Sequence, residues 1–481
     1  MLERTIVKYI PVQAVQAIVG FGAIAVFSRL LTPEEYGRYA LILAAMALLN
    51  IVTFLWLDAA VARFHARAER FGSIPHHLKT AYRLYAVAAV LAGGLGAGVI
   101  ALSPLDANYK AAAGFALVHM LARGALQIGL ETYRAGGEVR RYSINEIAAL
   151  LGGFGLGAVL VLVTELGAAG VFAGMAAALL VVTLADLPAM LSRARGGRGK
   201  PRRTRLYAGY GAGVSASVIF EHLLSVGDRF LIAAFLGAGA VGVYAAGYGL
   251  GDRLIDILFV WLSVAIWPMT IRALEREGEA AAREVARRAA AIMAAVTLPA
   301  AVGLILVAEP LTTLMIGGAM RAEAALILPW IAGAALLRGM MTYYFHEAFT
   351  LKRRPGLMAA LMAAAALLNL LLNLVLIPRF GIYGAAAATV IAYAAALLSC
   401  ALVSRSIFPL PLPWLEWAKA GFATAAMAGF VWLLPDLQPA LADLLMKAGA
   451  GASVYAALAL ALNLAGCRDG LGLLAAKRVP G

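Results

Sequence analysis

Long apolar runs follow one another along nearly the whole chain, separated by short polar segments. Most runs hold about 20 residues or more, the length that an α-helix needs to cross ~30 Å of hydrocarbon. They are continuous and rich in Leu, Ala, Val and Gly, without the two-residue alternation of a membrane β-strand. We therefore predict fourteen membrane-spanning helices, at residues 10–31, 38–62, 80–102, 111–135, 142–163, 169–190, 207–236, 241–269, 288–308, 324–350, 356–377, 381–404, 418–434 and 445–465.

The first polar break is "SRLLTPEEYGRY", residues 28–39. Thr32 can serve as an N-cap, and Pro33 suits the first position of a helix. Glu35 stands three residues after the threonine, which completes a capping box and places negative charge at the positive end of the helix dipole. The pattern predicts that one helix ends near Leu31 and that the next begins near Pro33.

Composition supports a membrane protein. Of the 481 residues, 63% are hydrophobic and only 14% are charged, which is too apolar for a soluble chain of this length. The fold class predicted is an all-α polytopic membrane protein. "MLERTIVKYI" leads straight into the first span, as in an uncleaved anchor. Cys400 and Cys467 are far apart, and the six histidines lack ligand spacing, so we expect neither a disulfide framework nor a metal site.

The distribution of basic residues predicts the orientation. With the N-terminus inside, most of the 40 Lys and Arg residues fall in cytoplasmic segments. Few fall in the opposite loops: Arg38, Lys110, Arg321, Arg379 and Lys447. By the positive-inside rule, both termini are cytoplasmic. The net charge of +14 is then largely a signal of topology, and no nucleic-acid partner is needed to explain it.

The most basic stretch, "SRARGGRGKPRRTRL" at 192–206, lies between the sixth and seventh spans. We interpret it as a cytoplasmic linker that contacts anionic membrane lipids. It divides the chain into an N-terminal six-helix lobe at 1–191 and a C-terminal six-helix lobe at 207–404. Residues 405–481 hold two additional helices, preceded by an interfacial elbow with Trp414 and Trp417, and a cytoplasmic tail.

The two lobes carry traces of an internal repeat. "LTPEEYGRYA" (31–40) aligns with "LGAGAVGVYA" (236–245) at an offset of 205, and "LARGALQ" (121–127) aligns with "LLRGMMT" (336–342) at an offset of 215. Six spans per half give both halves the same orientation, as in parallel repeats. Such two-lobed bundles place a substrate cavity between the lobes.

Three stretches resemble the polysaccharide transporter family, which contains Wzx-type O-antigen and exopolysaccharide flippases. They are "SRLLTPEEYGRYAL" (28–41), "DRFLIAAFLGAGAVGVYAAGYGL" (228–250) and "PRFGIYGAAAATVIA" (378–392), and the resemblance covers about 5–405. The family belongs to the superfamily of MATE exporters and the lipid II flippase. The resemblance implies a bacterial inner-membrane flippase that moves undecaprenyl-pyrophosphate-linked oligosaccharides to the periplasmic leaflet. It also implies a further partner in the polysaccharide polymerase machinery.

Charges inside the bilayer are costly and mark functional candidates. Arg123 and Arg338 lie near the middle of the fourth and tenth spans, at matching positions of the repeat. Arginine can grip phosphate oxygens with two parallel hydrogen bonds, so two arginines at one depth suit a pyrophosphate. The alternative is that each arginine pairs with a carboxylate, such as Glu131 or Glu347, and ties helices together.

Arg229 and Arg253 are further candidates for the pyrophosphate. In a hairpin between the seventh and eighth spans, Asp228 is expected within about one turn of Arg253, with Asp252 and Asp256 as neighbours of that arginine on its own helix. An ion-pair network that joins the two spans is the favoured interpretation, and such a network can rearrange during transport.

Other polar residues are candidates for ion coupling. Glu221 and His222 lie in the middle of the seventh span, where a carboxylate could exchange protons with a neighbour. Asn369 and Asn373 lie one turn apart on the eleventh span and face Thr389 across a short turn. The resemblance implies a sodium site, because comparable positions help to bind sodium in the lipid II flippase branch. The alternative is that the asparagines form hydrogen bonds that hold helices together. We expect no organic cofactor, with H⁺ or Na⁺ as coupling ion.

Two other function classes fit the sequence less well. A MATE-like exporter of cationic drugs should favour acidic groups over the arginines at cavity depth. An enzyme such as a polymerase or acyltransferase needs catalytic groups in a sizeable loop or pocket, whereas the external loops are short and no nucleophile–base arrangement is present in the sequence. The sequence therefore predicts a transporter that is not an enzyme.

The orientation gives a topological prediction. Reporters fused after Gly199 and at the C-terminus should both report the cytoplasm, because positive charge is concentrated in the segments assigned to that side. Activity of a periplasm-specific reporter such as alkaline phosphatase at either position would contradict the fourteen-span arrangement.

Overall fold

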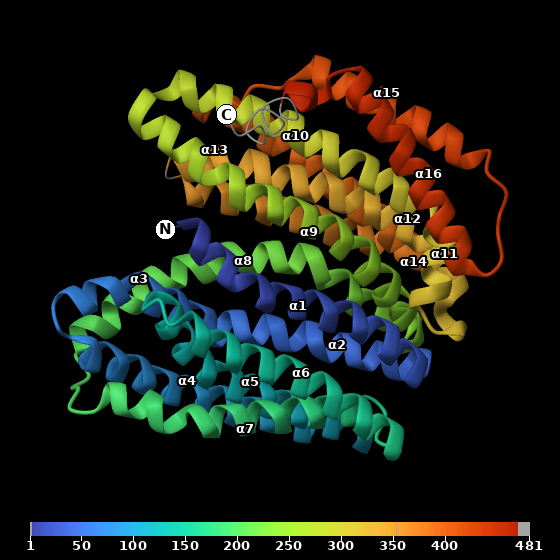
Figure 1. Ribbon diagram of the computed structural model, residues 1–481. Coiled ribbons are helices and arrows are strands. Elements are labelled where there is room, and N and C mark those ends of the chain that lie inside the picture. The colour runs from blue at the N-terminus through green and yellow to red at the C-terminus, as the bar shows by residue number, and fades with distance from the viewer. Residues whose placement is uncertain (1, 353, 470–481) are drawn as a thin grey trace, which may run out of the picture. The chain divides into compact units, whose positions relative to one another are not determined.

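The computed structural model describes residues 2–352 and 354–469, apart from a few side chains, and they are almost entirely helical. The chain divides into two compact units, Met1–Gly242 and Val243–Gly481. Each unit is a bundle of long helices in Figure 1. The predicted all-α polytopic fold class is confirmed.

The first unit contains eight α-helices and a five-residue π-helical segment among its described residues. They are α1 (Leu2–Leu30), α2 (Pro33–Asn50), η1 (Ile51–Leu55), α3 (Trp56–Arg70), α4 (Ile74–Leu102), α5 (Ala107–Ala135), α6 (Val139–Val163), α7 (Ala168–Ala194) and α8 (Pro201–Leu236). In Figure 1, α4 to α7 lie side by side, and α7 packs against both α5 and α6.

The second unit is formed from α9 onward, a helix that begins at the end of the first unit. Its elements are α9 (Ala238–Glu277), α10 (Glu279–Leu306), α11 (Ala308–Met315), α12 (Gly318–Met340), η2 (Met341–Phe345), α13 (His346–Leu351), α14 (Pro355–Ile407), α15 (Trp414–Trp432), α16 (Ala440–Ala461) and η3 (Leu464–Gly466). The added helices α15 and α16, red in Figure 1, pack on α10. Trp417 donates from Nε1 to the carbonyl of Ala290, and the Tyr455 hydroxyl donates to that of Ala295.

The predicted spans correspond to these helices. Among the described residues, 11 helices are long and apolar enough to cross a membrane. One of them, α14, holds two of the predicted spans, and α8 and α15 cover the two others that the length and hydropathy criteria leave out. The fourteen predicted spans therefore each have a helix, although several helices extend beyond the predicted ends.

The turn between the first two helices forms as predicted. Helix α1 ends at Leu30 and α2 begins at Pro33. The backbone N–H of Glu35 donates to the Thr32 hydroxyl oxygen at 3.2 Å, and the Glu35 carboxylate accepts the backbone N–H of Thr32 at 3.0 Å. This is a complete capping box.

The two predicted spans within α14 meet at Gly381. This glycine has φ 60° and ψ −142°, outside the helical region and strained for residues with a Cβ. Just beyond it, a Cβ on Gly384 would lie 2.2 Å from the carbonyl oxygen of Leu376. The chain therefore changes direction at one glycine and packs closely at the next.

Two helices contain π-helical turns that the apolar pattern did not predict. The second span runs from Pro33 to Arg70 through η1, and the tenth runs from Gly318 to Leu351 through η2. A π-turn inserts an extra residue into the helical ladder and rotates the side chains beyond it. Hydropathy is averaged over many residues, so it cannot register such a local insertion.

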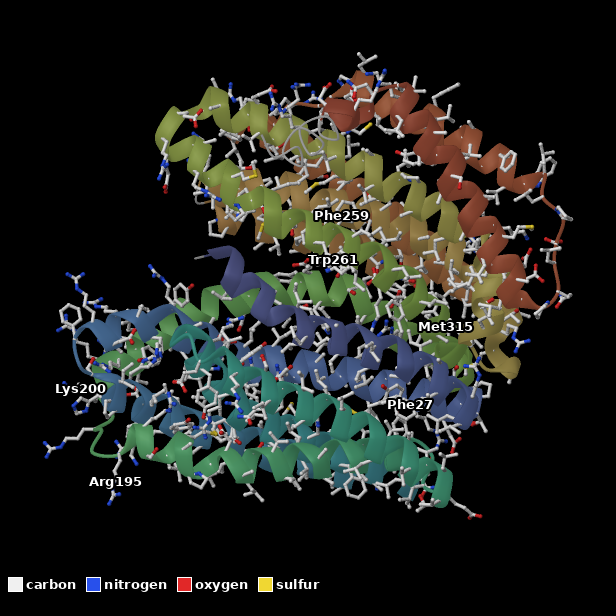
Figure 2. The ribbon with its side chains drawn as sticks, viewed as in Figure 1. Phe27, Arg195, Lys200, Phe259, Trp261 and Met315 are labelled. Carbon is white, nitrogen blue, oxygen red and sulfur yellow. The ribbon has the colours of Figure 1, made fainter. Side chains whose placement is uncertain are left out.

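The basic segment between α7 and α8 is held against the α3–α4 turn. Arg203 donates to the Ser73 hydroxyl at 2.9 Å, and the backbone N–H of Arg198 donates to His76 Nδ1 at 2.7 Å. Arg195 and Lys200 point away from the bundle in Figure 2 and are exposed. Exposed cations of this kind suit the predicted contact with anionic lipid.

Helix α8 packs within the first unit. Its Ser215 hydroxyl donates to the carbonyl of Ile51 at 3.1 Å, and the Tyr207 ring stacks on Phe64. The predicted division into lobes at 1–191 and 207–404, with the linker 192–206 and the C-terminal part 405–481, stays a prediction.

Close helix packing relies on glycine at a few sites. A Cβ on Gly174 of α7 would lie 2.2 Å from the backbone nitrogen of Gly157 on α6, whereas a Cβ on Gly155 would have no neighbour within 4 Å. Small residues let membrane helices approach in this way. The α6–α7 contact therefore tolerates no side chain at Gly174.

This contact gives a prediction about stability. Gly174→Ala should destabilise the detergent-purified protein by about 1–3 kcal/mol, because overpacking forces the two helices apart. Gly155→Ala is the matched control and should be neutral or slightly stabilising, since alanine favours the helix. Thermal unfolding of the two variants measures the difference, and an equal effect of both would contradict the packing argument.

Candidate functional site

In the first unit, Arg123 of α5 faces α6. Its Nη1 and Nη2 donate to the two carboxylate oxygens of Glu146 at 2.9 and 3.0 Å. The Glu146 side chain is buried, with 3% exposed, whereas that of Arg123 is 30% exposed. Gln16 of α1 adds a longer contact to the same carboxylate at 3.4 Å. The result is a closed two-point ion pair, the strongest geometry available to arginine and a carboxylate.

In the second unit, Arg338 of α12 faces α9. Its Nη2 donates to Asp252 at 3.0 Å and to Asp256 at 2.9 Å, and the Tyr343 hydroxyl of η2 donates to the same oxygen of Asp256 at 3.1 Å. We call these four residues the Arg338 cluster. It holds two carboxylates against one guanidinium, so its formal charge is negative when both aspartates are ionised.

The two arginines share one apolar neighbour, although their carboxylate partners lie on helices that do not correspond in the repeat. Gly124, next to Arg123, lies against the ring of Phe54, and Gly339, next to Arg338, lies against the ring of Phe259. The two phenylalanines are 205 positions apart, the offset of the first repeat segment. Each ring also stacks on a tyrosine, Phe54 on Tyr85 and Phe259 on Tyr343. The phenylalanine contacts agree with the internal repeat, whereas the two tyrosines lie at positions that do not correspond in it.

The sequence of this chain matches a known protein family. Residues 26–322 match the sequence model of a family described as "Polysaccharide biosynthesis protein". The match covers more than half of the chain. The chain belongs to this polysaccharide biosynthesis protein family. No curated protein sequence matches it.

Solved structures show the fold of this family member. The lipid II flippase MurJ in an inward closed conformation is similar at TM-score 0.71 and 11% identity, covering 96% of this chain and 100% of that one. An inward-facing multidrug resistance MATE transporter of the MOP superfamily is similar at TM-score 0.61 and 14% identity, covering 81% and 94%. Its outward-facing counterpart has TM-score 0.57 and 14% identity, covering 83% and 93%. The family resemblance predicted from sequence is confirmed, and the fold is that of transporters and flippases.

Both arginines pair with carboxylates, but the prediction that Glu131 and Glu347 are these partners was wrong. Glu131 accepts hydrogen bonds from Arg134 at 2.5 Å and Gln127 at 3.0 Å, both on its own helix. Within residues 2–352 and 354–469, Glu347 makes no hydrogen bond or ion pair. Glu146 is an intramembrane carboxylate on the next span, and that was the signal available for finding it.

The expected grouping around Arg253 also differs. Asp252 and Asp256 are one turn apart on α9, so both present their carboxylates to Arg338, whereas Arg253 is exposed on another face. Asp228 is buried and Arg229 is half-buried on α8. The pairing of Asp228 with Arg253 would join the two units, and it stays a prediction.

The coupling candidates lie where the spans were predicted. Glu221 and His222 are half-buried on α8. Asn373 donates from Nδ2 to the backbone carbonyl and the side-chain oxygen of Asn369, at 2.8 and 2.9 Å. The Thr389 hydroxyl donates to the Ala385 carbonyl at 3.0 Å. Both hydrogen bonds lie within one helix, and the role of the asparagines in coupling stays a prediction.

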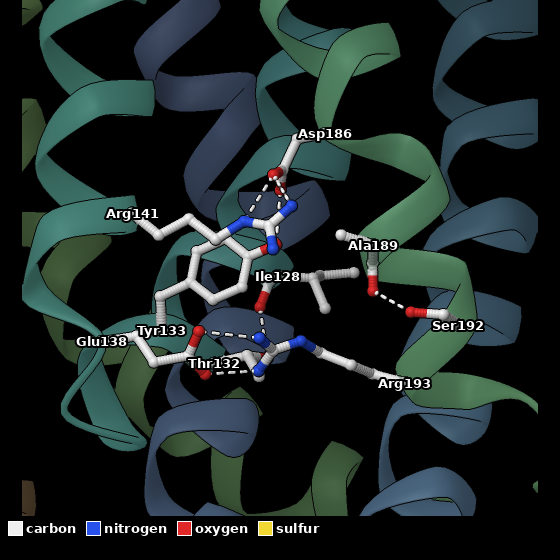
Figure 3. A network of polar contacts seen from close by, with 9 residues as sticks. All are labelled: Ile128, Thr132, Tyr133, Glu138, Arg141, Asp186, Ala189, Ser192 and Arg193. Atoms are coloured by element: carbon white, nitrogen blue, oxygen red, sulfur yellow. Dashed lines mark hydrogen bonds and ion pairs between the residues drawn. The ribbon is translucent and has the colours of Figure 1, made fainter.

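A polar network that the sequence did not predict joins α5, α6 and α7 (Figure 3). The Tyr133 hydroxyl donates to Asp186 at 2.5 Å, and Arg141 donates to the other oxygen of that carboxylate at 2.6 and 2.8 Å. Arg193 donates to both oxygens of Glu138 at 2.5 and 2.7 Å. The two guanidinium groups lie about 5 Å from the Tyr133 ring centre. The network ties the predicted cytoplasmic ends of these helices together.

The second unit also carries an apolar groove. It has a volume of about 660 Å³ and lies among α9, α10, α11, α15 and α16. Its lining is apolar apart from Lys447 and Tyr455. Lys447 pairs with Asp436 at 2.6 Å and with Asp443 at 2.9 Å, so the charge at the groove is neutralised locally.

The network of Figure 3 gives a pH-dependent prediction. Two hydrogen bonds from Arg193 hold the pKa of Glu138 below its ordinary value. The pair is partly exposed, so a double-mutant cycle of Glu138→Gln and Arg193→Gln should give a coupling of about 0.5–1 kcal/mol near pH 7.

The sign of the pH effect follows from the lowered pKa. The coupling is fully present above the pKa of an unfolded glutamate, about 4.3, and is lost as the pH falls through the lower folded value. Urea unfolding of the four variants at neutral and acidic pH measures it. A coupling that grows on acidification would contradict the assignment.

Proposed function

We propose that this protein is a flippase that moves undecaprenyl-pyrophosphate-linked oligosaccharides from the cytoplasmic to the periplasmic leaflet of the bacterial inner membrane. Its membership of the polysaccharide biosynthesis protein family supports a role in building surface polysaccharides. The likeness of its fold to a lipid II flippase supports a substrate that is a lipid-linked saccharide. The observation that carries the proposal is an arginine inside a predicted span of each unit, Arg123 and Arg338.

A lipid-linked oligosaccharide has a variable glycan and a constant anionic pyrophosphate. Arginine stays ionised in a protein and presents five N–H donors. Among the described residues, Arg338 makes both of its hydrogen bonds to aspartates through Nη2. The N–H groups on Nε and Nη1 are therefore available to a phosphate. Arg123 is 30% exposed and reaches beyond its buried partner. The two arginines therefore suit recognition of the constant part of the substrate, with Arg229 and Arg253 as additional candidates.

The carboxylates suggest how transport is coupled to an ion. A phosphate that approaches Arg123 competes with Glu146 for the same guanidinium. Protonation of Glu146, or of Asp256 in the Arg338 cluster, weakens the internal pair and releases the arginine for the phosphate. Coupling to H⁺ follows naturally from this exchange, with Glu221 as a further proton acceptor. A Na⁺ route through Asn369, Asn373 and Thr389 is the alternative.

A cation-coupled multidrug exporter is the second candidate function. The fold similarity to multidrug MATE transporters favours it, as does the excess of carboxylate over guanidinium in the Arg338 cluster. A cationic drug could use Asp252 or Asp256, whereas an anionic substrate must use arginine. Transport assays with a cationic dye and with a pyrophosphate-linked glycolipid distinguish the two functions.

The deciding experiment is leaflet-resolved transport in proteoliposomes. An undecaprenyl-pyrophosphate-linked oligosaccharide with a fluorescent glycan is placed in the membrane, and a membrane-impermeant quencher reports its leaflet. The purified protein should accelerate flipping over empty liposomes. If only the cationic dye is moved, the exporter is correct. Co-purification with polysaccharide polymerase components tests the proposed partner.

The arginines give a quantitative prediction. Arg123→Ala and Arg338→Ala should each reduce flipping per folded molecule by roughly 10- to 100-fold, since a lost hydrogen bond to a charged group costs about 1.5–3 kcal/mol. Lysine at either position should restore flipping only in part, because it supplies charge without the planar fork.

Arg134→Ala is the matched control. This arginine lies on the same helix as Arg123, and its side chain is 52% exposed. It should leave flipping unchanged. If the two test variants flip at wild-type rates, the pyrophosphate is recognised elsewhere. If their activity falls only because the protein disappears from the membrane, the arginines serve to tie helices.

A further inference from the structure

Glu347 stands apart from the other membrane carboxylates. It lies on α13, one helical turn before Leu351, where the span ends in the basic segment assigned to the cytoplasm. Among residues 2–352 and 354–469 it has no hydrogen-bond or ion-pair partner. Every other carboxylate discussed above is engaged, so this one is available for a different task.

Glu347 borders a small cavity. A cavity of about 20 Å³ is lined by Glu347 and Tyr343 from the end of the tenth span, by Trp267 and Ser263 from α9, and by Met293 from α10. A volume of this size is enough for one water molecule. Apart from Glu347, the described lining carries no side chain that is charged at neutral pH.

Tyr343 connects this cavity to the arginine site. It lines the cavity with Glu347, and its hydroxyl donates to Asp256 of the Arg338 cluster at 3.1 Å. Tyr343 lies within the π-helical turn η2, the irregular segment that separates α12 from α13. Tyr343 and Glu347 are four residues apart, so one helical turn brings both side chains to the face that lines the cavity.

The other titratable groups on the neighbouring elements do not pair with Glu347. At the start of α10, Glu279 binds both Arg283 and Lys352. His346 lies buried beside Glu347 on α13 and packs edge-on to Phe349, while Arg405 of α14 is exposed. None of these groups supplies a hydrogen bond or ion pair to Glu347 within the described residues.

We propose that Glu347 is a proton-exchange site of the second unit, connected through Tyr343 to the Arg338 cluster. A carboxylate without a counter-charge inside the bilayer is costly, so it takes a proton from cytoplasmic water. The protonated carboxyl then gives this proton to the Tyr343 hydroxyl, directly or through one water, as that hydroxyl passes its own proton to Asp256. Neutral Asp256 holds Arg338 less tightly, which frees the guanidinium for an anion.

The effect of this proton site on transport rests on the proposed function. The proton site itself can be tested without any substrate. Dicyclohexylcarbodiimide reacts with protonated carboxyl groups in apolar surroundings, and mass spectrometry of the purified full-length protein locates the adduct. Glu347 should be labelled at neutral pH, and its labelling should fall about tenfold per pH unit above its midpoint.

Glu309 is the internal control for labelling. It is an exposed glutamate on α11 of the same unit and should react little. Tyr343→Phe keeps the cavity but removes the hydroxyl, so Glu347 should still be labelled in that variant. Labelling of Glu347 no stronger than that of Glu309 across the pH range would overturn the proposal.

The consequence for transport is tested in proteoliposomes with an imposed proton gradient. Glu347→Gln and Tyr343→Phe should each remove the acceleration that the gradient gives to wild-type flipping, while Glu309→Gln should retain it. If Glu347 is labelled as expected but no glycolipid is moved by the wild type, the proposed function fails and the proton site stands. Full gradient dependence in both test variants would overturn the proton route.

Discussion

A charged side chain inside a bilayer must bring its counter-charge with it, and much of this structure follows from that constraint. Arg123 is closed against Glu146, Arg338 against two aspartates, and Lys447 against Asp443. The two arginine pairs each join different helices, α5 to α6 and α12 to α9. Removing one partner would leave an uncompensated charge in hydrocarbon, which is far more costly than removing both. The hydrophobic run of each helix determines that it crosses the membrane. The ion pairs determine which helices become neighbours.

Glycine supplies the second half of this arrangement. The residue after each arginine is a glycine that lies against an aromatic ring. Gly339 packs on Phe259 of α9, the helix that carries the partners of Arg338, whereas Gly124 packs on Phe54 of η1 and not on α6, the partner helix of Arg123. The dipeptides Arg123-Gly124 and Arg338-Gly339 thus combine a polar contact on one face with a close apolar contact on another. The same combination occurs in both units, together with the matching rings Phe54 and Phe259. A shared local chemistry is preserved where the sequences of the two halves otherwise differ.

How much could be predicted from the sequence depends on the kind of information needed. The spans and the capped turn at Thr32 follow from periodicity and local chemistry, and the structure agrees with them. The partners of the arginines did not follow, because pairing depends on the rotation of each helix about its axis. Asp252 and Arg253 are adjacent in sequence, yet one faces Arg338 and the other is exposed. The π-turn η2 changes that rotation again for Tyr343 and Glu347, and no averaged pattern reveals it.

The asymmetry between the two arginine sites matters more for function than their similarity. Glu146 and Arg123 neutralise each other one to one, so an anion gains little until the carboxylate takes up a proton. The Arg338 cluster has one carboxylate in excess, so its formal charge opposes the approach of an anion unless one aspartate is neutralised. On the proposed function, the first site recognises the phosphate and the second makes recognition conditional on protons. Two arginine sites with unequal carboxylates can thereby divide binding and coupling between them.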